Sequence, residues 1–182
     1  DFKNMFPSIE WKAIREAIAE LLPQLSKWCN WCHKRASLVR LPSGATVFCD
    51  RGAEQGDPLG PVYCAVVLSI VMNRVRSRLE NDGISIADVW YMDEGQLLCR
   101  PHEVDQVMRT IDEEAAHVGA ERGRGEDAKT VCRLLGSEGA KSQVDTFWQS
   151  DYITSSCVLT PDNCLEGHVL GINFDDLNGF TE

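Results

Sequence analysis

The sequence predicts an α+β fold in which an antiparallel sheet packs against helices on one face. Two pairs of short apolar segments are separated by turn residues, a pattern typical of β-hairpins. Longer segments between them carry apolar residues at helical spacing. Because strands and helices do not alternate strictly, the pattern disfavours a parallel α/β sheet. The sequence shows no internal repeat and no dividing linker, so residues 1–182 are expected to form one domain.

The individual elements follow from local patterns. Ser8 can cap a helix that Pro23 ends, and a second helix would turn Trp28 and Cys32 inward. A Pro-Ser-Gly turn separates the strands of the first hairpin. The expected helices cover residues 9–22, 25–35, 58–80 and 102–117. The expected strands cover residues 37–41, 45–49, 84–91, 95–99, 129–135, 153–160 and 167–174, with a polar loop over 121–128.

The composition is that of a globular protein, with 43% hydrophobic and 25% charged residues. The chain has 18 basic and 28 acidic residues and a net charge of −10. Such a charge repels phosphate backbones and argues against a chain that binds nucleic acid unaided. No apolar run approaches the ~20 residues that span a bilayer, so no membrane partner is expected. The cysteines lie mostly in apolar runs without a leader sequence, which predicts reduced thiols and an intracellular location.

Three acidic residues stand out by their context. Asp1 opens the segment DFKNMFPSI, which passes from extended chain into a helix, while Asp93 and Glu94 lie at the turn between two apolar strands. Adjacent carboxylates repel each other unless a cation neutralises them. Carboxylates from separate segments can surround two Mg²⁺ ions about 3.5–4 Å apart, since such ions prefer oxygen ligands. The alternative interpretation is an ordinary turn, in which Asp and Gly are common.

The segment RGAEQGDPLGP, residues 51–61, is a loop rich in glycine and proline. Gly56 and two prolines constrain the backbone just before a helix, whose free N–H groups favour a phosphate or a template strand. Gln55 offers both a donor and an acceptor to a sugar or a base edge. Taken alone, the loop is equally consistent with a rigid helix cap.

Together these segments resemble the consecutive palm motifs of reverse transcriptases, most closely those of non-LTR (LINE-type) retrotransposons. The matching strings are DFKNMFPSI, RGAEQGDPLGP, YMDEG, the lysine of DAKTVCRLL and HVLGINF. They extend from Asp1 to Phe174, and QGDPLGP followed by Y-x-D-acid is the most specific part. The resemblance implies a polymerase palm with RNA-directed DNA polymerase activity. For an active element it also implies a nuclear location.

The resemblance assigns roles residue by residue. The matching positions are, for metal binding and catalysis, Asp1, Asp93 and Glu94; for nucleotide binding, Phe2, Phe6, Gln55, Gly56 and Lys129; and for the primer grip, Leu170 and Gly171. The implied cofactor is a pair of Mg²⁺ ions that serve nucleotidyl transfer to a primer 3′-hydroxyl. The implied partners are an RNA template, a DNA primer and deoxynucleoside triphosphates. The primer-grip strands would lie near residues 153–174.

Two departures from the family pattern affect these expectations. Glu94 stands where the family usually has a second aspartate, and the extra methylene displaces the carboxylate. The chain starts at Asp1, so we expect the family's fingers and thumb to be missing from it. These 182 residues alone are therefore expected to be inactive. The alternative is a truncated or decayed retroelement remnant that folds but catalyses nothing.

A competing motif is formed by Cys29, Cys32 and His33, which fit the C-x-x-C-H pattern of haem attachment. The pattern lies in a Trp-rich helical segment and no export signal accompanies it. A zinc site would need a fourth ligand, and the sequence has no second close cysteine pair. Neither haem nor zinc is therefore expected.

Overall fold

The computed structural model describes residues 2–53, 56–123 and 130, together with the backbone of residues 132–133, 158–159, 168–169 and 172–173. The chain divides into two compact units. Unit 1 covers Asp1–Gly123 and unit 2 covers Arg124–Glu182. The described candidate residues of the functional site, among them Phe2, Gly56 and Asp93, belong to unit 1.

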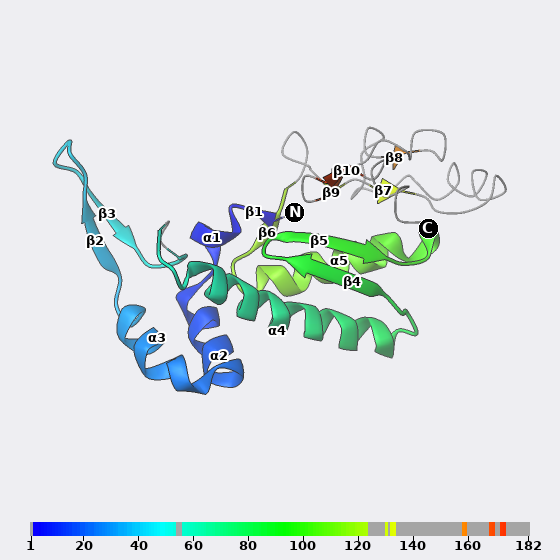
Figure 1. Ribbon diagram of the computed structural model, residues 1–182, viewed down its shortest axis with the longest axis horizontal. Helices are drawn as coiled ribbons and strands as arrows, with labels where there is room; N and C mark the ends of the chain where they lie inside the picture. The colour runs from blue at the N-terminus through cyan, green and yellow to red at the C-terminus, as the bar shows by residue number, and fades with distance from the viewer. Residues whose placement is uncertain are drawn as a thin grey trace, which may run out of the picture. The chain divides into compact units, whose positions relative to one another are not determined.

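Three helices form the centre of unit 1 (Figure 1). The long α4 (Gly60–Asn81) packs against both α2 (Trp11–Leu21) and α5 (Val104–Ala116). Each of the three carries apolar residues at helical spacing on the face that it buries. The core side chains of these helices are Ile14, Ala17, Ile18, Tyr63, Cys64, Val67, Leu68, Val71, Met72, Val75, Leu79, Val107, Met108, Ile111 and Ala115. The predicted helical stripes of α2, α4 and α5 are thereby confirmed.

The strands of unit 1 form small two-stranded antiparallel sheets. Strand β2 (Ser37–Arg40) pairs with β3 (Thr46–Cys49), and β4 (Ala87–Tyr91) pairs with β5 (Glu94–Leu98). Both predicted hairpins are therefore present. The combination of helices with antiparallel strands confirms the α+β class.

The two hairpins differ in how they are covered. In β4 and β5 alternate residues are half-buried and exposed, so one face of the hairpin is covered. The ion pair between Arg76 of α4 and Asp88 of β4 joins the covered face to the helix, and Figure 1 shows the two running alongside each other. In β2 and β3 every residue except Cys49 is exposed, and the hairpin extends away from the helices (Figure 1).

A strand pair that the sequence did not predict closes unit 1. Strand β1 (Phe2–Lys3) pairs antiparallel with β6 (Glu121–Arg122), in the segment expected to be a polar loop. The side chain of Arg122 is only 5% exposed and donates to Asp112 of α5 at 3.0 Å. A strand of two residues is too short to show the alternation of polar and apolar residues that would predict it. Its polar residues therefore indicated a loop, although Arg122 is buried and paired with Asp112.

The short helices correct two local expectations. Ser8 lies inside α1 (Met5–Ser8), and the N-cap of α2 is Glu10, so Ser8 does not cap α2. Pro23 does end α2, and it opens the 3₁₀ turn η1 (Pro23–Leu25). A second 3₁₀ turn, η2 (Pro101–Glu103), precedes α5.

Helix α3 (Ser26–Cys32) is shorter than predicted, and the expected inward position of Trp28 is wrong. Trp28 is 52% exposed and Trp31 is 73% exposed, and their rings lie 5.2 Å apart on the surface. The buried face of the helix instead centres on Cys29, while Cys32 is half-buried. The buried face is therefore offset by one residue from the predicted one, a rotation of about 100° around the helix axis.

In unit 2 the described residues form two further strand pairs. Strand β7 (Cys132–Arg133) pairs in parallel with β8 (Val158–Leu159). Strand β9 (His168–Val169) pairs antiparallel with β10 (Ile172–Asn173). The segment 167–174 was predicted as one strand, whereas it contributes two strands that pair with each other.

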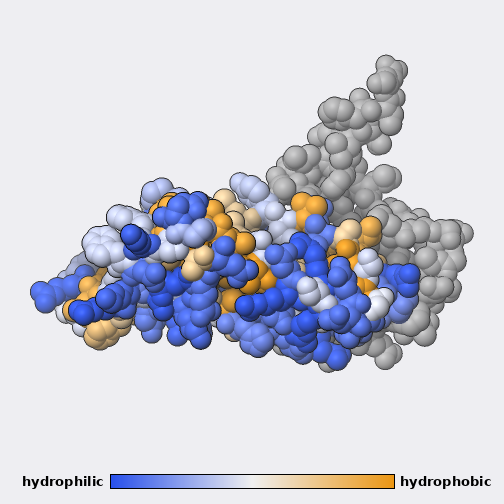
Figure 2. Space-filling model, turned by 90° about the horizontal axis from the view of Figure 1, so that it is seen from below, coloured by the Kyte–Doolittle hydropathy of each residue, from blue (hydrophilic) through white to orange (hydrophobic). Residues whose placement is uncertain are grey.

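The surface of unit 1 combines hydrophilic areas with separate apolar patches, as Figure 2 shows for one face. The most exposed large apolar side chains are Leu38, Phe48, Val89, Tyr91 and Leu98, together with the two tryptophans of α3. Among the described residues, no helix combines the length and the apolar character that a membrane span requires.

Candidate active site

The N-terminal strand lies directly against the tip of the β4–β5 hairpin. The backbone N–H of Phe2 donates to the carbonyl oxygen of Asp93 at 3.3 Å. On its other side Phe2 pairs with Arg122 of β6. Asp1 itself lies outside the described residues, but it is covalently joined to the residue that makes this hydrogen bond. Two of the predicted motifs, about ninety positions apart in the sequence, therefore meet in space.

The hairpin tip is a two-residue turn formed by Met92 and Asp93. Tyr91 and Glu94 pair across the strands and close the turn. Met92 has a φ of 55°, in the left-handed region that non-glycine residues rarely adopt. Such a conformation is costly and is retained where the surrounding structure requires it.

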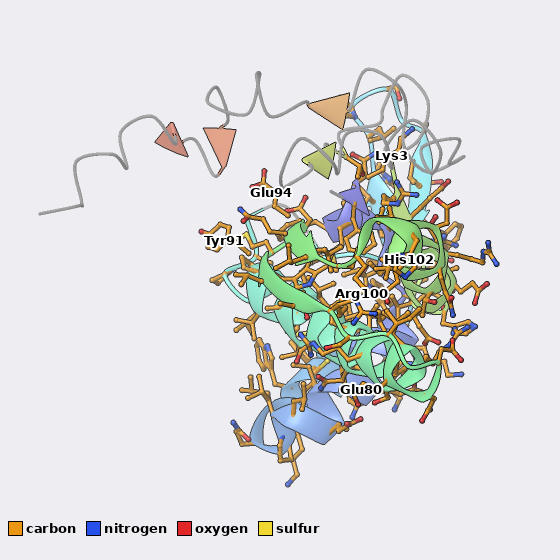
Figure 3. The ribbon with its side chains drawn as sticks, turned by 90° about the vertical axis from the view of Figure 1, so that its right-hand side faces the viewer. Lys3, Glu80, Tyr91, Glu94, Arg100 and His102 are labelled. Carbon is orange, nitrogen blue, oxygen red and sulfur yellow. The ribbon has the colours of Figure 1, made fainter. Side chains whose placement is uncertain are left out.

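The two adjacent acids of the tip differ in their surroundings. Asp93 is half-buried in the turn, whereas Glu94 is the first residue of β5 and is exposed. Figure 3 shows Tyr91 and Glu94 projecting outward from the same end of the hairpin. Glu94 was expected in the turn itself, and the structure places it one step later, in the ladder. Its carboxylate therefore has free access to solvent.

The beginning of helix α4 lies near the same tip. Cys64, in the second turn of α4, is fully buried. Burial raises the pKa of the Cys64 thiol to about 12, and the negative charge of Asp93 adds to the increase. The Cys64 thiol therefore stays protonated at neutral pH.

The glycine-rich loop begins against the first motif. Gly52 donates its backbone N–H to Ile9 at 2.6 Å, and Ala53 donates to the carbonyl oxygen of Phe6 at 2.7 Å. The indole N–H of Trp11 donates to the carbonyl oxygen of Gly52 at 2.8 Å. A Cβ on Gly52 would lie 2.5 Å from the backbone of Pro7, so only glycine fits here. Two motifs that are distant in sequence are thereby fastened together by backbone contacts.

The end of the loop forms the start of α4. The side chain of Asp57 accepts a hydrogen bond from the N–H of Leu59 at 2.9 Å, and its carbonyl oxygen accepts one from Gly60 at 3.0 Å. Sequence reasoning did not single out Asp57. An Asp before Pro at the start of a helix is the signal that would have identified this turn. Gly56, just before it, has a φ of 95° and open space around its Cα.

The remaining candidate residues divide into two groups. Phe2 is buried and its ring stacks on Trp90, while Phe6 is half-buried in α1. The others lie outside the described residues: Asp1, Gln55, Lys129, Leu170 and Gly171. Unit 1 therefore gathers three of the predicted motifs, represented by Phe2, Gly52 and Asp93.

The donor set at the tip suits a hard divalent cation. Asp93 and Glu94 supply carboxylate oxygens, which Mg²⁺ prefers over nitrogen or sulfur. Within the part of the chain that the structure describes, no group of three His, Cys, Asp or Glu side chains could hold a metal ion. Asp1, which lies outside those residues, is the acid whose neighbour touches Asp93.

The C-x-x-C-H segment is packed into the interior of unit 1. His33 is 7% exposed, and its Nδ1 lies 3.1 Å from the carbonyl oxygen of Cys29. The rings of Trp11 and Tyr63 contact the imidazole edge-on at 5.3 and 5.0 Å. Burial raises the pKa of the thiols of Cys29 and Cys32, which keeps them protonated. These residues thus fill the space between α3, α2 and α4.

Comparison of the chain with models of protein families gave no match, and a search of curated proteins gave none either. The interpretation of the site therefore depends on its own residues and their arrangement.

Proposed function

We propose that this chain is the palm of an RNA-directed DNA polymerase, of the kind found in non-LTR (LINE-type) retrotransposons. The observation that supports it most is the hydrogen bond from Phe2 to the carbonyl oxygen of Asp93. It brings the segment that starts at Asp1 to the acidic turn, as two-metal nucleotidyl transfer requires of its carboxylates. The anchoring of Gly52 and Ala53 on the same segment adds the third motif.

The proposed reaction adds a deoxynucleotide to the 3′-hydroxyl of a primer. Asp1 and Asp93 would hold two Mg²⁺ ions, with Glu94 as the further acid. When bound, the ions supply charge neutralisation for the attacking hydroxyl and the leaving pyrophosphate. The protein's own part would be positioning, because Asp93 is held in the hairpin turn and Asp1 directly precedes β1.

The other roles follow the resemblance. The loop with Gln55 and Gly56 would contact the incoming nucleotide and the template, and Phe6 would crowd a ribose 2′-hydroxyl. Lys129 would meet the triphosphate, and Leu170 and Gly171 would lie at the primer. An RNA template and a DNA primer both carry dense negative charge, whereas this chain has a net charge of −10. Stable binding of the duplex would therefore need basic surfaces beyond this palm.

A second candidate is a remnant that has lost catalysis. The exposed position of Glu94 in β5 favours it, because the longer side chain extends from the ladder toward solvent. In this case the palm would keep its fold and its contacts to nucleic acid while the second metal ligand is misplaced.

Primer extension on an RNA template with Mg²⁺ tests the proposal. The protein would join these residues to the fingers and thumb of a LINE-type enzyme. Replacing Asp93 with Asn should reduce the rate of extension by roughly 100-fold or more. A bound metal ion lowers the free energy of the charged transition state by several kcal/mol, and loss of its ligand removes that stabilisation. Asp50→Asn is the matched control, because Asp50 is an exposed acid at the base of the other hairpin. Equal extension by the Asp93→Asn variant would contradict the proposal.

The same assay separates the two candidates. A protein that binds template and primer but adds no nucleotide until Glu94 is replaced by Asp would establish the remnant. Extension by the unaltered sequence would exclude it.

A further inference from the structure

We infer that Trp90 is the positioning residue of the proposed metal site, whose indole sets the separation between β1 and the hairpin tip. The inference rests on the proposed function and names the side chain that holds its two acidic segments in register. Trp90 lies three residues before Asp93, on the half-buried face of β4. It is held from three sides, and each contact is made by a different part of the ring.

The first contact is with the opposite strand. Trp90 pairs with Gly95 of β5. A Cβ built on Gly95 would lie 2.3–2.5 Å from the six-membered ring of Trp90. The indole therefore lies across Gly95, in space that any other residue would occupy with its own side chain. Cross-strand packing of an aromatic ring on a glycine compensates for the glycine's missing side chain.

The second contact fixes the rotation of the ring. The indole N–H of Trp90 donates to Oδ2 of Asp88 at 2.9 Å. Asp88 has a side chain that is 3% exposed, and it accepts two hydrogen bonds from Arg76 of α4, at 2.8 and 2.7 Å. A two-bond guanidinium–carboxylate pair has a defined geometry. Through Asp88 and Arg76, the orientation of the indole is therefore fixed relative to α4, the longest helix of unit 1.

The third contact joins Trp90 to Phe2 of β1. The rings of Trp90 and Phe2 are stacked, with centroids 5.7 Å apart and planes inclined by 27°. Phe2 is 3% exposed, so its ring has few alternative positions. Its backbone N–H is the group that reaches Asp93. A change in the size of residue 90 would thus move Phe2, and with it β1, relative to the turn.

The inference is tested on the 182-residue chain by Mn²⁺ titration, with free Mn²⁺ followed by electron paramagnetic resonance. Trp90→Leu should weaken Mn²⁺ binding by roughly 10-fold or more, as removal of supporting contacts around metal ligands does. Trp90→Phe keeps a stacked ring and should recover most of the affinity. Ile111→Ala is the matched control, because Ile111 is buried in α5 and its loss lowers stability alone.

A second readout reports the placement of β1 without any metal. Hydrogen exchange at the Phe2 amide should accelerate at least 10-fold in Trp90→Leu and stay unchanged in Ile111→Ala. Unchanged Phe2 exchange in folded Trp90→Leu, or unchanged Mn²⁺ affinity, would overturn the inference. If Mn²⁺ binding by the unaltered chain is absent or does not depend on Asp93, the proposed function fails, while faster exchange would still establish the positioning of β1 by Trp90.

Discussion

At the scale of single residues, two glycines with similar backbone conformations serve different purposes. Gly52 has a φ of +77° and Gly83 has a φ of +76°. A Cβ on Gly83 would meet nothing within 4 Å, whereas a Cβ on Gly52 would lie 2.5 Å from the backbone of Pro7. Gly83 is thus required only for its conformation after α4. Gly52 is required for the close approach of the loop to the first motif.

This difference predicts unequal effects of substitution by alanine. Gly83→Ala should lower the free energy of unfolding by about 1–2 kcal/mol, the cost of a left-handed residue with a Cβ. Gly52→Ala adds a backbone collision and should cost roughly 3–5 kcal/mol. Urea unfolding followed by tryptophan fluorescence measures both. Equal losses in the two variants would show that the loop does not pack on Pro7 as described.

Single residues also mark what the sequence could not predict. Trp28 was expected to face the core, yet both it and Trp31 are exposed. Helical spacing defines a stripe, but in a seven-residue helix several stripes fit equally well. The contacts of His33 with Trp11 and Tyr63 select the face, and they come from other elements.

At the scale of elements, the two hairpins differ in what stabilises them. The β4–β5 hairpin has a covered face and the ion pair between Asp88 and Arg76. The β2–β3 hairpin has apolar side chains exposed along both strands, with Leu38 57% exposed and Phe48 71% exposed. A two-stranded hairpin without a covered face is marginally stable in water.

Hydrogen exchange should therefore rank the elements of unit 1. Amides in the β2–β3 hairpin should exchange roughly 100-fold faster than those in the middle of α4, because local opening exposes little apolar surface. The β4–β5 hairpin should fall between them. Exchange measured by mass spectrometry on peptides from the three segments checks this order. Protection of β2–β3 equal to that of α4 would contradict the exposed position of the hairpin.

The elements with strong patterns were the ones that the sequence predicted well. Helix α4 begins and ends within two residues of its expected bounds, and the turns of both hairpins were located. Strand β6 was not predicted because its partner, β1, lies at the other end of unit 1. A two-residue strand is defined by its partner and not by its own composition.

At the scale of the whole molecule, the first motif is the segment on which the others converge. Residues 2–10 are contacted by Gly52 and Ala53 from the loop, by Asp93 from the hairpin, and by Val118 and Arg122 after α5. The acidic residues of the proposed site could be picked out from the sequence, and the resemblance implied that their segments meet, but local patterns alone did not show that Phe2 and Asp93 lie together. That meeting depends on contacts across long stretches of chain, which local patterns do not encode.

The proposed function requires that the carboxylate at the start of the chain and the one at the hairpin turn share bound metal. Replacing Mg²⁺ with Fe²⁺ and adding ascorbate and peroxide cleaves the backbone next to the ion, and mass spectrometry locates the cuts. A shared site should give cleavage at residues 1–3 and at residues 92–94 together. Both sets of cuts should disappear in Asp93→Asn and persist in Asp50→Asn. Cleavage confined to one of the two segments, or unaffected by loss of Asp93, would contradict the shared site.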